Sequence, residues 1–447
     1  MADLVLTDAK AYVKDAMVEC SIAVDEGRIL KIGRETNMPT SDEKMRLKGL
    51  LVLPGLVDVH VHLRDEGKSY KEDFFSGTAA AAAGGVTTVL DMPNNEPVTM
   101  SAEALRNRMR IAESRVIVNV GFYSEFPSKT SEIGEIRRIG AIAFKLFMGQ
   151  QIGGLDINSD GSLKEAFESA AKLKIPVAVH AEDNGMVRKA EEELKHAGHN
   201  DLAAFLKAHS ERVEAKAVER ALGIAKLARA KLHVCHVSTG DSVRSIAEAK
   251  KSGLPVTCEV TPHHLLLSSE ELRRIGPVAV TVPPVRELQT ASSLWDGVRN
   301  GWIDMVGSDH APHLLSEKSS DVVWQIKSGI PGLETTLPLL LTEVSRGRLS
   351  LGDLVRLTAE NPAKAFGLNG KGSLKEGSDA DLAIVDLKDE FRIDASGFHS
   401  KAKYSPFDGR NVKGRAVQTF VKGMLVMDKG EIVAKPGSGC VLRGRGV

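Results

Sequence analysis

Six residues that could bind metal lie at the ends of short apolar runs spread along the sequence. They are His60, His62, Lys145, His180, His236 and Asp309. Imidazoles and carboxylates are the usual ligands of zinc and similar divalent ions in proteins. A bound ion of this kind lowers the pKa of a water molecule and polarises a carbonyl group. The chemistry that these residue types predict is therefore metal-assisted hydrolysis.

The spacing of these residues favours one shared site. His60 and His62 are two residues apart, so a β-strand places both imidazoles on the same side, where they can chelate one ion. Two ions need a bridging anion, and Lys145 can supply one if CO2 caps its amine as a carbamate. Asp309 is expected to bind metal and to carry a proton from the attacking water to the leaving nitrogen. Each residue alone is more often an ordinary polar residue, so the prediction depends on their convergence.

Eight apolar runs alternate with segments of helical periodicity in the middle of the chain. The runs cover residues 55–63, 85–93, 116–124, 141–149, 175–183, 231–239, 255–263 and 303–311, and predicted helices between them include 101–115, 162–174 and 241–252. Alternating strands and helices predict a parallel sheet, and eight parallel strands close into a (β/α)8 barrel. Functional residues of such a barrel lie at the C-terminal ends of its strands, which is where the six candidates fall.

The two ends of the chain have a different pattern. Residues 2–52 and 379–434 contain hairpin-like pairs of alternating strands around glycine turns. Neither end is large enough to bury a core alone, so we expect one small composite β domain formed from both termini, with two independent flaps as the alternative. The predicted fold class is α/β, a (β/α)8 TIM-type barrel at 53–370 with a β domain made of 1–52 and 371–447.

The composition is typical of a soluble globular protein, and its charge balance favours a small-molecule site. Its 59 basic and 59 acidic residues give a net charge of zero, which removes the electrostatic reason to expect nucleic acid or an anionic membrane as a partner. The four cysteines are far apart and indicate neither a disulfide framework nor a thiolate zinc site. The sequence has no leader pattern and no run of ~20 apolar residues, so we expect a cytoplasmic protein.

The remaining histidines carry weaker signals. Four fall in predicted helices or loops and are expected at the surface: His196, His199, His209 and His399. Three are expected to support the site or the core: His233, His263 and His264. Strand alternation predicts that Cys235 faces away from His236 as a buried thiol.

The order of these motifs resembles the amidohydrolase superfamily, in particular its cyclic-amide branch of dihydroorotases, allantoinases and hydantoinases. The likeness is carried by LPGLVDVHVHLRDEG (53–67), AAAAAGGVTTVLDMPNN (79–95), AFKLFMG, HAED, CHVST, EVTPHHLLLS (259–268), GSDHAPH (307–313) and GIPGLETTLPLLLT (329–342). The resemblance implies that two zinc ions are held by four histidines and Asp309, that carboxylated Lys145 bridges them, and that Asp309 is also the general acid/base. The implied histidine ligands are His60, His62, His180 and His236.

Within this branch, three residues resemble the dihydroorotase pattern, where they hold the carboxylate of the substrate. These are Arg64, Asn94 and His313. A guanidinium is a planar, bidentate receptor for a carboxylate, although an arginine here could also form a surface ion pair with Asp65 or Glu66. Gly332 is expected to let the backbone approach the polar edge of the ring. The resemblance implies reversible conversion of dihydroorotate to N-carbamoyl-aspartate in pyrimidine synthesis, by a homo-oligomer that is a dimer or a tetramer.

Two positions depart from the dihydroorotase pattern. Glu66 stands where a proline is common after the Arg-Asp pair, and Val282 stands where the Asn-Pro-Pro-Leu-Arg motif begins with asparagine. The loss of one buried polar contact lowers affinity by ~0.5 to 1.5 kcal/mol or accompanies a shifted substrate. The alternatives are therefore allantoinase activity, hydantoinase or dihydropyrimidinase activity, and a non-catalytic dihydroorotase-like subunit.

Overall fold

The structure is a computed structural model that describes residues 1–13 and 16–444. The predicted terminal ranges 1–52 and 371–447 include residues 14–15 and 445–447, which lie outside the described residues. Among the described helices, none combines the length and the apolar character needed to cross a membrane.

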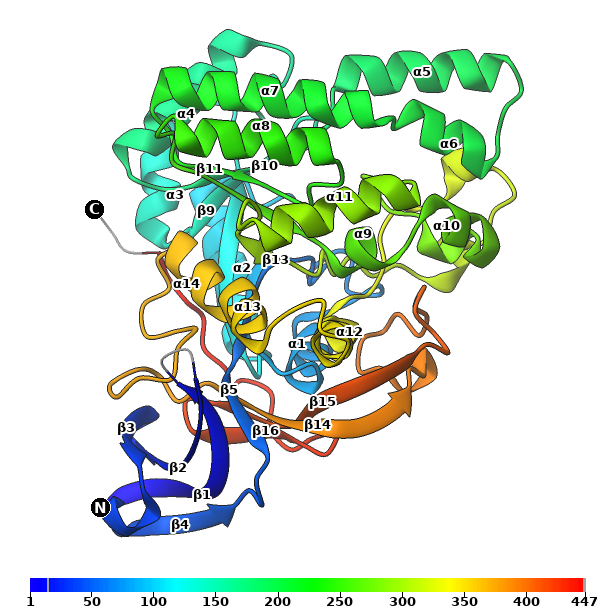
Figure 1. Cartoon of the computed structure of the whole chain (residues 1–447). Helices are drawn as coiled ribbons and strands as arrows, with labels where there is room; N and C mark the ends of the chain where they lie inside the picture. The colour runs from blue at the N-terminus through cyan, green and yellow to red at the C-terminus, as the bar shows by residue number, and fades with distance from the viewer. Residues whose placement is uncertain (14–15, 445–447) are drawn as a thin grey trace.

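A parallel sheet of eight strands forms a barrel within the described residues (Figure 1). Its strands are β6 (Leu56–Val61), β7 (Val86–Asp91), β8 (Asn119–Glu125), β9 (Ala143–Phe147), β10 (Val177–His180), β11 (Leu232–Val234), β12 (Val256–Val260) and β13 (Met305–Val306). The barrel closes where His62 donates its backbone N–H to the carbonyl of His310 at 2.8 Å. Each predicted run overlaps one of these strands, so the predicted (β/α)8 barrel is confirmed.

Helices surround the barrel and connect its strands. They are α1 (Phe74–Ala83), α2 (Ala102–Glu113), α3 (Ile133–Ile139), α4 (Asp160–Lys172), α5 (Asn184–His196), α6 (Leu202–Ala208), α7 (Glu211–Ala228), α8 (Gly240–Lys251), α9 (Pro262–Leu266), α10 (Ser269–Ile275), α11 (Leu288–Arg299), α12 (Leu333–Ser345), α13 (Leu351–Val355) and α14 (Asn361–Ala365). The predicted helices correspond to α2, α4 and α8. Each of these three begins after a Ser or Thr whose side chain accepts a hydrogen bond from a backbone N–H three residues on: Ser101, Ser159 and Thr239.

A second sheet joins the two ends of the chain. Its strands are β1 (Ala2–Val13), β2 (Ala16–Asp25), β3 (Arg28–Gly33), β4 (Ser41–Arg46), β5 (Leu51–Pro54), β14 (Leu382–Arg392), β15 (Asn411–Val421), β16 (Met424–Asp428) and β17 (Glu431–Ile432). β5 pairs with β1 on one side and with β14 on the other. Figure 1 shows the blue N-terminal strands beside the orange and red C-terminal ones. The predicted composite β domain is thus confirmed, and the alternative of two independent flaps is wrong. The exact domain boundaries stay a prediction.

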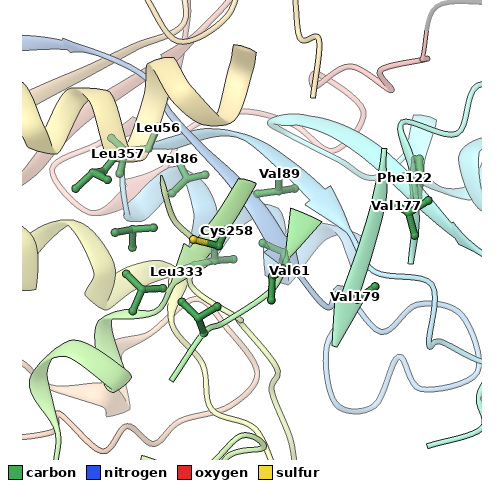
Figure 2. Packing of buried hydrophobic residues seen from close by; sticks show 14 of the residues in the cluster. Leu56, Val61, Val86, Val89, Phe122, Val177, Val179, Cys258, Leu333 and Leu357 are labelled. Atoms are coloured by element: carbon green, nitrogen blue, oxygen red, sulfur yellow. The ribbon is translucent and has the colours of Figure 1, made fainter. Parts of the chain in front are cut away.

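The barrel strands are buried on both faces. Residues on the outer face pack against the helices in one large apolar cluster. Figure 2 shows part of this cluster, in which Val61, Val86 and Val89 come from neighbouring strands and Leu333 and Leu357 come from the helical layer. Strands buried on both faces read as nearly continuous apolar runs, which is why the sequence pattern located all eight.

The first barrel strand is irregular where it reaches the site. Its pairing with β7 shifts register within residues 58–61. Val59 packs in the inner apolar cluster with Cys235, and the next residue, His60, also has a ligand atom near the Cys235 thiol. Two consecutive residues therefore face the interior, as expected of a β-bulge, which re-aims a side chain. This irregularity directs His60 and His62 into the barrel mouth.

Candidate active site

The metal-ligand candidates gather at the C-terminal ends of the barrel strands. A cavity of about 600 Å³ opens there, and its lining includes His60, His62, His180, His236 and Asp309. The sixth candidate, Lys145, is fully buried on β9. Residues separated by up to 249 positions are thus brought to one cavity by the closed barrel.

His60, His62 and Asp309 form one compact group. Nε2 of His60 and Nε2 of His62 lie 3.4 and 3.3 Å from Oδ1 of Asp309. His60 donates a hydrogen bond from Nδ1 to the Glu259 carboxylate, and His62 donates from Nδ1 to Oδ1 of Asn94 at 2.6 Å. Donation from Nδ1 leaves the Nε2 lone pair of each ring facing Asp309, which is the tautomer that a metal ligand requires.

His180 and His236 form a second group beside the first. Nδ1 of His180 lies 3.0 Å from Nε2 of His236, and His180 donates from Nε2 to Glu182 at 2.9 Å. The ring centroids of His236 and His60 are 5.1 Å apart, which joins the two groups. Nδ1 of His236 is buried and has no hydrogen-bond partner in the described part of the chain. Because His180 gives its ring proton to Glu182, its Nδ1 lone pair faces Nε2 of His236, and these two nitrogens are the pair between which a metal ion would fit.

Lys145 lies in surroundings that suit a carbamate better than an ammonium ion. Its Nζ is 2.9 Å from Sγ of Cys235, and no described carboxylate lies within 4.0 Å of it. Burial of an unpaired ammonium ion is strongly unfavourable. Reaction with CO2 releases its protons and converts it into an anionic carbamate, whose charge would be balanced by cations that the neighbouring imidazoles could hold. Cys235 is a buried thiol, as predicted, and its Sγ contacts Lys145.

Burial keeps the imidazoles of His60, His62 and His236 in the neutral form that binds metal. It lowers the pKa of His60 to about 4, and the charge of Lys145 adds to this effect. Burial also lowers the pKa of His62 well below its usual value, with a further contribution from Arg64. The pKa of His236 is likewise held well below its usual value by burial. The donor set of neutral imidazoles and a carboxylate therefore fits a divalent metal.

Three residues of the site have left-handed backbone conformations. The φ angles are 62° at Arg64, 34° at His236 and 47° at Asp309. Positive φ is uncommon for residues other than glycine, and strained residues of this kind cluster at functional sites. All three follow the end of a barrel strand, so the turns aim their side chains into the cavity.

The predicted substrate residues lie at the same cavity. Its lining includes Arg64, Asn94 and His313, and Nη2 of Arg64 is 3.4 Å from Nε2 of His313. Because Asn94 accepts a hydrogen bond from His62, it also links the candidate anion receptor to the metal ligands. Val282, at the position of the family asparagine, lines the cavity as well. An apolar residue thus faces the cavity at this departure from the dihydroorotase pattern.

Gly332 lies behind the cavity. Its backbone N–H donates to Nδ1 of His310 at 3.1 Å, and an added Cβ would lie 2.9 Å from the carbonyl oxygen of Ser308. Glycine is required here for close packing against the residue before Asp309. The described cavity lining includes Gly329, from the same GIPGLE turn, and does not include Gly332. The expected backbone contact of Gly332 with a substrate therefore stays a prediction.

Glu259 is an important residue that sequence reasoning did not find. It lies on β12, is fully buried, and accepts hydrogen bonds from His60 and from Nε2 of His233, the latter at 3.2 Å. Burial alone would raise the pKa of its carboxyl group, but these two imidazoles hold the pKa below its usual range. Glu259 therefore fixes the tautomer of His60, and His233 supports the site as predicted.

The predicted surface position of His209 is wrong. His209 is buried at the end of α6 and lines the cavity, because α5 and α6 form part of the cavity wall. It donates from Nδ1 to Oε1 of Glu182 at 2.9 Å, and Nε2 lies 3.7 Å from Glu191. Since Glu182 also accepts a hydrogen bond from His180, His209 is connected to the metal-ligand candidates.

We predict that His209 makes the stability of the protein depend on pH. Burial lowers the pKa of His209, but the carboxylates of Glu182 and Glu191 outweigh burial and raise it from 6.5 to about 9. A folded-state pKa above the unfolded value stabilises the protein fully below pH 6.5, and this contribution is lost as the pH rises through about 9. The melting temperature of wild-type protein should therefore exceed that of His209→Gln at low pH, with a difference that shrinks at alkaline pH. A constant difference would contradict this.

Comparison with known proteins agrees with this geometry over the whole chain. The protein-family model described as "Amidohydrolase family" matches residues 51–426 of this chain. The dihydroorotase of Methanothermobacter thermautotrophicus is 40% identical over 433 residues, which are 97% of this chain and 96% of that protein. The L-hydantoinase of Paenarthrobacter aurescens is 37% identical over 98% of this chain and 97% of its own length.

The solved structures give the same result. The structure of L-hydantoinase (dihydropyrimidinase) from Arthrobacter aurescens has a TM-score of 0.96 at 36% identity, and the match covers 99% of this chain and 100% of that one. Dihydropyrimidinase from Brevibacillus agri has a TM-score of 0.92 at 27% identity, covering 98% of each chain. With a family match across the barrel and relatives of the same length, this chain belongs to the amidohydrolase family.

Proposed function

We propose that this amidohydrolase is a dihydroorotase, which interconverts (S)-dihydroorotate and N-carbamoyl-L-aspartate in de novo pyrimidine biosynthesis. Dihydroorotate is a cyclic amide with a carboxylate on its ring, so its enzyme needs an anion receptor beside the hydrolytic centre. The observation that carries the proposal is Arg64, whose buried guanidinium lines the cavity and has no described carboxylate within 4.0 Å. Full-length relatives named dihydroorotase support it. Cytoplasmic location and assembly as a homo-oligomer stay predictions.

Arg64 is built to receive an anion. Its side chain is 7% exposed, and its Nε has no hydrogen-bond partner among the described residues. The neighbouring carboxylates that could have paired with it are engaged elsewhere: Asp65 with Arg115 at 2.9 Å, and Glu66 with Asn107 at 2.8 Å. Burying an unpaired charge is costly unless a ligand of opposite charge arrives. A substrate carboxylate meets that need.

We infer that two zinc ions are held by the four histidines and Asp309, with carboxylated Lys145 as the bridge between them. When bound, such ions activate a water molecule for attack and polarise the amide carbonyl of the substrate. Support comes from the neutral imidazoles of His60, His62 and His236, and from Nδ1 of His180 and Nε2 of His236, which face each other. The buried amine of Lys145, which has no described carboxylate within 4.0 Å, also supports it.

Asp309 is the group proposed to move the proton. Its carboxylate sits at the cavity, 3.3 Å from Nε2 of His62. In hydrolysis it accepts the proton that the attacking water gives up and delivers it to the ring nitrogen as the C–N bond breaks. In ring closure the same proton moves in reverse. Arg64, Asn94 and His313 hold the substrate carboxylate, which fixes the ring relative to Asp309.

Hydantoinase or dihydropyrimidinase activity is the second candidate. The likeness to L-hydantoinase in sequence and in structure favours it, and Val282 in the cavity lining departs from the dihydroorotase pattern. Hydantoin and dihydrouracil have no ring carboxylate, so they would leave the Arg64 guanidinium unpaired in the bound complex. The free-energy cost of leaving this buried charge unpaired makes dihydroorotate the preferred substrate in our proposal.

A substrate panel tests the proposed function. Purified, zinc-loaded protein is assayed against dihydroorotate, dihydrouracil, hydantoin and allantoin under the same conditions. We expect the highest kcat/KM for dihydroorotate, with N-carbamoyl-aspartate as the product. A higher kcat/KM for a neutral ring would replace the proposal by the corresponding activity. Turnover of none of the four by metal-replete protein would favour a non-catalytic subunit.

Removal of metal should abolish activity reversibly. Dialysis against a chelator is expected to remove two ions per chain and most of the turnover, since the water is no longer activated. Zinc supplied with bicarbonate should restore activity more fully than zinc alone, because the carbamate on Lys145 forms from CO2. The Lys145→Ala variant serves as the control that bicarbonate cannot rescue. Full activity in protein shown by elemental analysis to be free of metal would contradict the metal centre.

A further inference from the structure

Lys71 contacts His313, one of the candidate substrate-binding residues. It lies in the loop between β6 and α1, is buried, and is absent from the described cavity lining. Its Nζ is 3.1 Å from Nδ1 of His313 and 2.6 Å from Oε1 of Glu317. A lysine ammonium group only donates hydrogen bonds. Its partner nitrogen on His313 must therefore be an acceptor.

The contacts of the second ring nitrogen agree with this assignment. Nε2 of His313 lies 3.1 Å from the carbonyl oxygen of Ser328, which only accepts, and 3.4 Å from Nη2 of Arg64, which only donates. At Nδ1, the Lys71 contact at 3.1 Å is shorter than the 3.5 Å to Oε2 of Glu317. On both nitrogens the shorter contact selects the tautomer that carries its proton on Nε2.

The acceptor for that proton is held in place by a second buried lysine. Nζ of Lys318 donates hydrogen bonds to the carbonyls of Lys327 and Gly329, at 2.8 and 3.0 Å, and to that of Val280 at 2.8 Å. These bonds fix the backbone on both sides of Ser328. His313 is thus restrained at Nδ1 by Lys71 and at Nε2 by a rigid carbonyl.

We propose that Lys71 is a specificity-determining positioning residue, which locks His313 as an Nε2–H donor, so that the proton which the Ser328 carbonyl accepts is shared with the carboxylate of the substrate in a three-centre hydrogen bond. The inference rests on the proposed function, because it assigns that carboxylate to the Arg64 and His313 side of the cavity. Nε2–H and the Arg64 guanidinium then present donors only, which suits an anion and penalises a neutral or hydrogen-bond-donating group. Lys71 itself adds little net charge, since Glu317 neutralises it.

Removal of the Lys71 ammonium group should reverse the tautomer. Without it, the nearest described charged group to Nδ1 is the Glu317 carboxylate at 3.5 Å, which would take a hydrogen bond from Nδ1–H. Nε2 would then offer a lone pair to the substrate carboxylate and repel it. The hydrolytic residues would be unchanged, because Lys71 does not contact them in the described structure. Substrate binding, not the chemical step, should therefore suffer.

The test compares Lys71→Met, Lys71→Arg and Glu317→Gln with wild type. For Lys71→Met we expect KM for dihydroorotate to rise about 10- to 100-fold, the equivalent of one hydrogen bond to a charged group, with kcat little changed. Lys71→Arg keeps a donor-only group and should restore most of the affinity. In Glu317→Gln the amide oxygen can still accept from Lys71, while the charge that Glu317 neutralised is no longer balanced, so KM for the anionic substrate should not rise. If general loosening of the loop were the cause, both Lys71→Met and Glu317→Gln would raise KM.

The tautomer itself can be observed by NMR of protein labelled with 15N-histidine. The His313 signals are assigned by their loss in His313→Gln. We expect Nε2–H in wild type and Nδ1–H in Lys71→Met. Nδ1–H in wild type, or an unchanged KM in Lys71→Met, would overturn the inference. If wild type does not turn over dihydroorotate, the proposed function fails instead, and the NMR result still decides whether Lys71 sets the tautomer.

Discussion

Replacing Asp309 by asparagine is expected to lower kcat for dihydroorotate by about 10²- to 10⁴-fold, the usual contribution of a positioned general acid/base. Asparagine has the shape of aspartate but cannot take up and release the proton. The backbone should tolerate the change, because φ at this position is 47° and asparagine adopts that left-handed region more readily than most residues. Steady-state kinetics on folded, zinc-loaded variant protein measure the effect.

The Asp309→Asn result needs a control for metal loss and for folding. Asp304→Asn is matched, since Asp304 comes just before β13 at the opposite end of the same strand and pairs with Lys250 at 2.5 Å, far from the cavity. It should leave kcat close to wild type. Metal content and melting temperature are measured for both variants. A metal-replete Asp309→Asn protein with wild-type kcat would remove the proton-transfer role.

The barrel could be predicted from sequence because its signals are local. A parallel strand buried on both faces is a continuous apolar run, and the eight runs are separated by helical segments of ordinary length. The irregular pairing within residues 58–61 could not be predicted in this way, because it depends on how β6 pairs with the neighbouring strand β7. Strict alternation would have put Val59 and His60 on opposite faces, whereas both face the barrel interior.

The candidate ligands could be predicted because each one interrupts an apolar run at the end of a strand. Glu259 interrupts a run too, in VTCEVT, and a charged residue inside a predicted buried strand is a signal that needs a partner. Its partner His60 is 199 residues away, so only the closed barrel shows the pairing. His209 offered no such signal, since it follows an ordinary helical segment. Its burial comes from the packing of α5 and α6 at the cavity.

The same reasoning explains why the substrate is harder to predict than the reaction. The metal-ligand candidates can be recognised by their residue types, whereas the proposed anion receptor, Arg64, is indicated by the lack of a described carboxylate within 4.0 Å of its guanidinium. Arg64 is informative because Asp65 and Glu66 are engaged with other residues, and no described carboxylate lies within 4.0 Å of its guanidinium. The proposed positioning role of Lys71 is indicated only by its 3.1 Å contact with His313, which is 242 residues away in the sequence. Specificity therefore depends on contacts that sequence spacing does not encode.

The Arg64→Met variant is expected to lower kcat/KM for dihydroorotate by about 10²-fold or more, because it removes charge-assisted hydrogen bonds to the substrate carboxylate. Activity on dihydrouracil should not fall, since that ring has no carboxylate to lose a partner. Arg106→Met is the control, because Arg106 is exposed, pairs with Glu135 at 3.8 Å and lies outside the described cavity lining.

Stability separates this specificity role of Arg64 from a structural one. A buried guanidinium without a carboxylate partner destabilises the folded state, so methionine of similar length should leave the melting temperature of Arg64→Met equal to that of wild type or higher. A structural arginine would show the opposite, with lower stability and equal losses on every substrate. Unchanged kcat/KM for dihydroorotate in Arg64→Met would remove the anion receptor, and with it the main reason to prefer dihydroorotate over a neutral ring.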